Sequence, residues 1–161
     1  MSKMKLKLFC AGIFAGCALG LVTLRVALAT PQQGVSTTIL TGRAVELGEV
    51  DVKSESDVNE VEIRIKGESD VYGVRNVVAP GGHTGWHSHP GPSIISVVSG
   101  TATEYHEDDP VGTVHAEGTA FVDDGVGAHI VRNEGNTNLE LIAFQILPAG
   151  APRRIDEPAP F

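Results

Sequence analysis

The chain has 161 residues, which is room for one domain and little more, and it carries 20 acidic against 12 basic side chains. Its formal net charge of −8 leaves no basic surface for a polyphosphate backbone. Nucleic acid is therefore not expected as a partner.

Residues 1–29 have the pattern of a secretory signal peptide. Three lysines stand among the first seven residues, an apolar run covers residues 8–24, and small side chains follow at Ala27 and Ala29. This order predicts export with cleavage after Ala29, and hence a periplasmic or extracellular protein. If the segment stays uncleaved, it predicts a membrane anchor instead.

Cleavage would change the chemistry of the remaining chain. Both cysteines, Cys10 and Cys17, lie in the removed segment, so the mature chain would have no disulfide and no thiolate ligand. Four of the 12 basic residues and no acidic residue would leave with it, which takes the net charge from −8 to −12.

The rest of the chain has the pattern of short β-strands separated by glycine and proline. We expect an N-terminal extended segment with the first barrel strands at 30–69, a core at 70–150, and a tail at 151–161 that is extended over the barrel or disordered. Strands are predicted at 58–66 (half-buried), 70–80 (ended by Pro80-Gly81-Gly82), 94–100, 101–106, 118–122, 128–133 and 138–147. This spacing is typical of an all-β sandwich or barrel.

Three histidines stand within seven positions, at His83, His87 and His89. Side chains alternate across a strand, so His87 and His89 share a face and could grip one metal ion from one side. An H-x-H pair can equally consist of ordinary histidines with local hydrogen bonds.

The flanking residues give this stretch a family resemblance. Gly81, His87, His89 and Gly100 match the first motif of the cupin superfamily, and Ser93 stands where that motif carries a glutamate. The match extends over about residues 70–150 when the second motif is included.

The second motif is matched by Gly118, His129 and Asn133, whereas Asp124 stands in the place of its turn proline. The resemblance implies a single jelly-roll β-barrel of six to eight strands. It also implies one divalent transition metal inside the barrel, with Fe, Mn, Zn, Ni and Cu as candidates.

Carried over residue by residue, the resemblance implies His87, His89 and His129 as metal ligands and leaves Ser93 as a vacated ligand position. Three neutral nitrogens leave the ion its full double charge and open positions, which favours a small organic anion as the bound molecule. Loss of the glutamate could also mean a barrel that holds no metal.

Other polar residues have weaker roles. Gln145 shares the parity of an apolar strand face and is a candidate pocket residue. In the turn before His129, Asp123 or Asp124 is a candidate for orienting a ligand histidine from behind, with Asp124 in the motif position. His83 is a further candidate for this role, and could also be a fourth ligand or an exposed residue. His106 and His115 read as solvated loop residues.

Two functions of different classes follow. One is a metal-dependent enzyme on a small organic anion, similar to the non-haem dioxygenases of the family. The other is a non-catalytic module that binds a metal or a small molecule. A third option is an isomerase or lyase that uses the same metal without O₂. A homodimer is an expectation from the resemblance alone.

Overall fold

The computed structural model describes residues 28–41 and 46–161, and every regular element in these ranges is a β-strand. The strands are β1 (Gln33–Ile39), β2 (Glu46–Leu47), β3 (Val50–Glu55), β4 (Glu60–Ile65), β5 (Ser69–His83), β6 (His87–Ser88), β7 (Ser93–Ser99), β8 (Thr101–His106), β9 (Asp109–Ala116), β10 (Ala120–Asp123), β11 (His129–Arg132), β12 (Leu139–Pro148) and β13 (Ile155–Asp156). The described ranges contain no helix that is long and apolar enough to cross a membrane. The predicted signal sequence, with Cys10 and Cys17, falls on residues outside the described ranges, apart from its last two positions.

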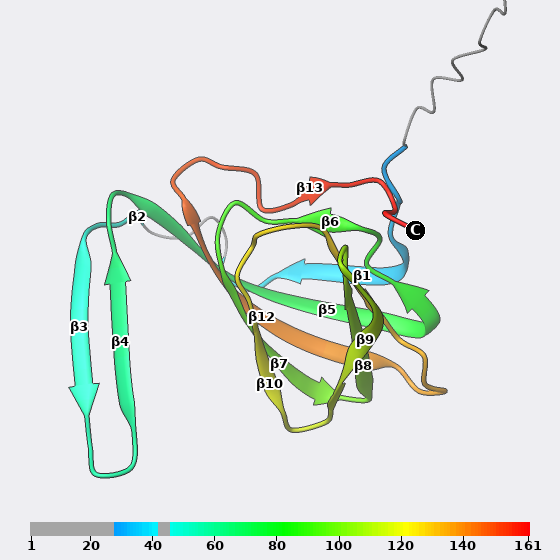
Figure 1. Cartoon of the computed structure of the whole chain (residues 1–161), viewed down its shortest axis with the longest axis horizontal. Coiled ribbons are helices and arrows are strands. Elements are labelled where there is room, and N and C mark those ends of the chain that lie inside the picture. Colours follow the sequence, from blue (N-terminus) through cyan, green and yellow to red (C-terminus); the bar gives the residue numbers. More distant parts are fainter. Residues whose placement is uncertain (1–27, 42–45) are drawn as a thin grey trace, which may run out of the picture.

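An antiparallel sheet centred on β5 curls on itself into a nearly closed barrel (Figure 1). β12 pairs with β5 along its whole length, from Leu139 beside Val78 to Pro148 beside Ser69. The strand order is β10-β7-β12-β5-β11-β6-β13, with β1 and β2 also on β5 and β8 joining β11 to β9. The predicted all-β jelly-roll barrel is therefore confirmed. The core contributes the eight strands β5–β12, within the expected six to eight, and β1, β2 and β13 bring the sheet to 11 strands.

The barrel interior has an apolar part, to which β12 contributes by alternating buried and less buried side chains. Val78 and Leu139 are cross-strand partners, and both are fully buried. Val74, Val97 and Leu141 complete the centre of this cluster. Each such side chain stabilises the fold by roughly 1.5–3 kcal/mol through burial. Polar residues, among them Ser93, Asp123 and Gln145, also lie inside the barrel.

The strand predicted to end at Pro80 runs on to His83. The Pro80–Gly82 segment stays in the sheet because Asn133 holds it by backbone bonds to Gly81 N (2.9 Å) and Gly82 O (3.0 Å). The Asn133 side chain, 1% exposed, also donates to Val78 O at 2.8 Å. The asparagine of the second motif thus ties the end of β5 in place.

Both terminal segments are parts of the barrel. Residues 33–39 form β1 on β5, and the tail contributes β13, which pairs with β6 next to the histidines (Figure 1). The two segments also contact each other, since Thr30 N donates to Glu157 O at 3.0 Å. Extended structure over the barrel was one of the two expectations for the tail.

The strand predicted at 58–66 exists as β4, but it is not half-buried in the barrel. β3 and β4 form a separate two-stranded sheet that stands away from it (Figure 1). Val61 and Ile63 on its apolar face are 44% and 46% exposed. The alternation of apolar and polar residues predicts an amphipathic strand, but it does not predict what packs on the apolar face.

Candidate metal centre

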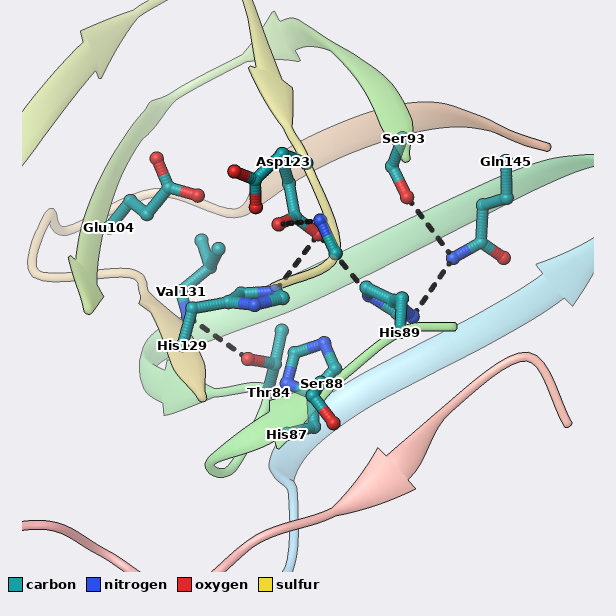
Figure 2. A network of polar contacts seen from close by, with 12 residues as sticks. Thr84, His87, Ser88, His89, Ser93, Glu104, Asp123, His129, Val131 and Gln145 are labelled. Carbon is teal, nitrogen blue, oxygen red and sulfur yellow. Dashed lines mark hydrogen bonds and ion pairs between the residues drawn. The ribbon is translucent and has the colours of Figure 1, made fainter. Parts of the chain in front are cut away.

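Three imidazoles converge inside the barrel from two neighbouring strands (Figure 2). His87 on β6 is the cross-strand partner of His129 on β11, and their ring centroids are 4.2 Å apart. His89 follows two residues after His87, with ring centroids 4.8 Å from His87 and 5.3 Å from His129. One ring nitrogen from each lies within 4.8 Å of the others, so these residues can hold one ion.

A turn at Gly85 positions His87 and His89. Gly85 has a φ of +71°, in the left-handed region that glycine adopts without strain. A Cβ at this position would overlap the carbonyl oxygen of Thr30, so no larger residue fits. Trp86 then points away from the histidines into packing, where its ring meets Phe161 edge-on at 5.3 Å.

Backbone carbonyls orient two of the rings. Gly85 O accepts from His87 Nδ1 at 2.9 Å, and Arg153 O accepts from His89 Nδ1 at 2.5 Å. A proton on Nδ1 leaves the Nε2 lone pair free, which is the usual arrangement behind a metal-binding histidine. The Gln145 amide nitrogen also lies 3.3 Å from His89 Nδ1, but both atoms would be donors, so we assign the His89 proton to the shorter contact.

The imidazoles are neutral at pH 7. Burial lowers the pKa of His87 well below 6.5, with further lowering by His129. Burial likewise lowers the pKa of His89, and that of His129 to about 4. The neutral ring is the form that binds a metal ion, so no proton has to be displaced at neutral pH.

Ser93 and Gln145 lie beside the histidines in one row across the sheet. Ser93 on β7 is the register partner of both Gln145 on β12 and Asp123 on β10. Ser93 is 2% and Gln145 4% exposed, and Gln145 Nε2 donates to Ser93 Oγ at 3.5 Å (Figure 2). The vacated ligand position therefore opens into the interior. Gln145 Oε1 accepts from Arg153 at 3.1 Å.

The two residues proposed to support the ligands from behind have different positions. His83 Nδ1 accepts from Gly85 N at 3.1 Å, and the carbonyl of the same Gly85 orients His87, so His83 holds the turn that aims a ligand. Asp124 is exposed, and its Oδ1 accepts from Val126 N at 2.8 Å. The carboxylate next to the imidazoles belongs to Asp123, because strand alternation turns that residue inward.

A second buried carboxylate, Glu104, was not anticipated. It is 5% exposed on β8, with Oε2 3.2 Å from His115 Nε2 and Oε1 3.6 Å from His106 Nε2. His106 is in turn the register partner of His129, and His115 stacks on Phe121 at 3.9 Å. Neither histidine is the solvated loop residue expected from the sequence. The shared parity of Ala102, Glu104 and His106 was the available signal.

The histidines open onto a cavity of about 240 Å³. Its apolar wall includes Val74, Ile95 and Leu141, and its polar lining includes Glu104, Asp123 and Gln145. Arg153 and Arg154 from the tail also line it. Sequence reasoning missed these two arginines, because a Pro-Arg-Arg run in a tail carries no periodic pattern.

The donor set fits a divalent transition metal. Three neutral ring nitrogens are suitable ligands for Fe, Mn, Zn, Ni or Cu. The Asp123 Oδ2 atom, which is buried and has no hydrogen-bond partner, lies 3.8 Å from His89 Nε2 and 3.7 Å from His129 Nε2. A buried carboxylate oxygen without a donor is costly unless a cation accompanies it.

Comparison with known proteins places the chain among barrels of this kind. The family model described as a cupin domain matches residues 74–145. A cupin superfamily protein from Desulfitobacterium hafniense is 11% identical, with a TM-score of 0.48 over 74% of this chain and 84% of its own. The cupin domain of an XRE family transcriptional regulator from Enterobacter cloacae is 15% identical, with a TM-score of 0.46 over 75% and 100%. A predicted oxalate decarboxylase from Thermotoga maritima is 25% identical, with a TM-score of 0.42 over 51% and 83%.

The search of curated proteins gave no match. The family match runs from β5 to β12 and includes His87, His89, Ser93 and His129. It agrees with the antiparallel barrel and with the two motifs found in the sequence. The chain belongs to the cupin superfamily.

Proposed function

We propose that this protein binds one divalent transition metal through His87, His89 and His129 and receives a small organic anion in the adjoining cavity. The observation that carries the proposal is the convergence of three neutral, buried imidazoles on one cavity of about 240 Å³. This volume suits a small molecule.

Two arginines support an anionic ligand. Arg153 and Arg154 line the same cavity as the histidines, although the chain as a whole is acidic. Burial lowers the pKa of Arg153, yet an arginine keeps its charge at neutral pH. Its guanidinium is held by Gln145 at 3.1 Å and lies 5.8 Å from the Tyr72 ring centroid. A carboxylate or enolate entering the cavity would meet this charge.

We further propose a dioxygenase-like activity on that anion. A bound iron would supply Lewis-acid and redox chemistry. The chain itself supplies neutral imidazoles that need no deprotonation, an arginine to orient the anion, and the buried Glu104 as a proton acceptor within the cavity lining. Glu104 supports the enzyme over the non-catalytic module, because its Oε1 atom is buried on the cavity wall without a hydrogen-bond partner.

Metal analysis of the wild-type chain and of histidine variants tests the proposed metal binding. The protein as isolated and after Zn²⁺ or Co²⁺ loading should hold one ion per chain. His87→Ala, His89→Ala and His129→Ala should each abolish stoichiometric binding, because each removes one of three nitrogen donors. His83→Ala removes a contact of the turn before His87 but no proposed ligand, so it should keep one ion per chain, at most with a weaker affinity. If the wild-type chain holds no ion, or His83→Ala loses it equally, the proposed ligand set is wrong.

Oxygen uptake separates the two functions. The iron-loaded protein should consume O₂ with at least one member of a panel of small chelating anions, and Arg153→Gln should raise the KM for it. Ligand binding without oxygen uptake or conversion of any panel member would leave the non-catalytic module as the function. A homodimer remains a proposal that light scattering of the purified protein would test.

A further inference from the structure

Asp123 is a buried carboxylate on the wall of the histidine cavity. It ends β10, in which Val122 is 66% exposed and points outward, so the alternation of the strand turns Asp123 inward. The residue is 1% exposed and lines the cavity. Acidic side chains are almost never buried to this degree without a partner.

The two oxygens of Asp123 have different surroundings. Oδ1 accepts from Gly125 N at 2.9 Å, which fixes the carboxylate in the turn after β10. Oδ2 has no hydrogen-bond donor and is aimed at the histidines, 3.7 Å from His129 Nε2 and 3.8 Å from His89 Nε2 (Figure 2).

These separations are close to those of atoms that share one ion. Oxygen and nitrogen ligands about 2.0–2.2 Å from a divalent ion stand roughly 3.0–3.5 Å apart. Oδ2 is slightly farther than that from both Nε2 atoms. A small closure around a cation would therefore bring all three atoms into coordination. It would also remove the cost of the buried, unpaired charge.

The position of Asp123 relates directly to the missing glutamate. The first motif of the family places its glutamate at the position of Ser93, on β7. Asp123 is the register partner of Ser93 on the adjacent strand β10. A carboxylate one strand away reaches the same part of the barrel, and the small Ser93 side chain leaves room for it.

We propose that Asp123 is the fourth protein ligand of the metal ion and that it replaces, from β10, the glutamate that the family carries on β7. This inference rests on the proposed metal site. The ligand set is then three nitrogens and one anionic oxygen, and the bound ion keeps one net positive charge instead of two. The site is a relocated one-carboxylate centre and not a three-histidine centre.

Asp123→Asn tests the ligand, with Asp124→Asn as the matched control. The asparagine keeps an oxygen for the Gly125 N–H and removes the charge at the other atom, while Asp124 is the exposed neighbour of the same type. Co²⁺ affinity, measured from its visible absorption, should fall 10- to 100-fold in Asp123→Asn and less than 2-fold in Asp124→Asn. Circular dichroism of the metal-free variants establishes that both are folded.

A measurement on the unmodified chain does not depend on the folding of any variant. With aspartate labelled by ¹³C at the carboxyl carbon, Zn²⁺ should shift one carboxyl resonance and leave the others in place. Wild type that binds no metal would overturn the metal site itself. Wild type that binds Zn²⁺ with no shifted aspartate signal, or an Asp123→Asn affinity equal to that of Asp124→Asn, would overturn only the role of Asp123.

Discussion

The three cavity histidines are neutral because the barrel buries them, and this neutrality links the candidate site to the stability of the metal-free protein. In the unfolded chain a histidine titrates near 6.5, whereas burial lowers the pKa of His129 to about 4 in the folded chain. Below pH 6.5 the unfolded state therefore binds more protons than the folded state. Stability is fully present above pH 6.5 and is lost as the pH falls toward 4.

We predict that the metal-free protein loses stability steeply between pH 6.5 and 4. His129 alone would account for at most about 3 kcal/mol of the free energy of unfolding, since one pKa unit corresponds to about 1.4 kcal/mol. Urea titrations at several pH values measure the slope. His129→Gln should flatten it, because glutamine does not titrate. An unchanged slope in His129→Gln would show that other groups dominate the pH dependence.

Among single residues, the sequence predicts the site residues that belong to a motif with fixed spacing. It misses those whose position depends on how the strands are paired. His87, His89 and Ser93 follow from the spacing within the first motif, and the structure places them with His129 around one cavity. Asp123 was indistinguishable from Asp124 in sequence, because the phase of a four-residue strand decides which of the two faces inward. Arg153 reaches the cavity only through the pairing of β13 with β6.

At the scale of elements, the sequence predicts the strands that have one buried face, but it does not predict which strands pair with one another. The predicted 101–106 strand is β8 with the same bounds, and the predicted 138–147 strand is β12 to within one residue at each end. The short strands β6 and β13 have two residues each, too few for a periodic signal. The β3–β4 hairpin is the opposite case: its sequence alternates clearly, but no barrel strand in the described ranges packs on its apolar face.

The hairpin is stabilised mostly by itself. Its charged face carries the pairs Lys53–Glu60 at 3.2 Å and Arg64–Asp51 at 3.4 Å, and such exposed pairs contribute about 0–1 kcal/mol each. Neither β3 nor β4 belongs to the barrel sheet. The barrel should therefore not depend on it.

We predict that the hairpin can be shortened without loss of the barrel. Val50 and Ile65 are register partners, so replacing residues 51–64 by Asn-Gly closes the chain with a two-residue turn. Metal stoichiometry should be unchanged and the melting temperature should move by only a few degrees. The matched comparison is Leu139→Ala in the buried cluster, which should cost about 2–5 kcal/mol. A shortened chain as unstable as Leu139→Ala would mean that the barrel needs the hairpin.

At the scale of the whole molecule, the two ends of the barrel domain meet beside the candidate metal site. Thr30 N bonds to Glu157 O, Ala29 forms a bridge with Pro158, and β13 pairs with the strand that carries His87. The tail residues Arg153 and Arg154 line the cavity as a result. The cavity is thus built from the chain between about Thr30 and its tail, whereas the matching family model ends at residue 145.

This arrangement bears on the proposed export. Cleavage after Ala29 would remove the Ala29–Pro158 bridge and keep both the Thr30–Glu157 bond and β1. We therefore predict that protein recovered from the periplasm or medium of producing cells begins at Thr30, lacks both cysteines, and binds metal like the full chain. Mass spectrometry of the purified protein measures the N-terminus. Ala29→Leu should block cleavage, because the signal peptidase requires a small residue before the cut. An intact N-terminus on wild-type protein in the membrane fraction would contradict the prediction and identify the segment as an anchor.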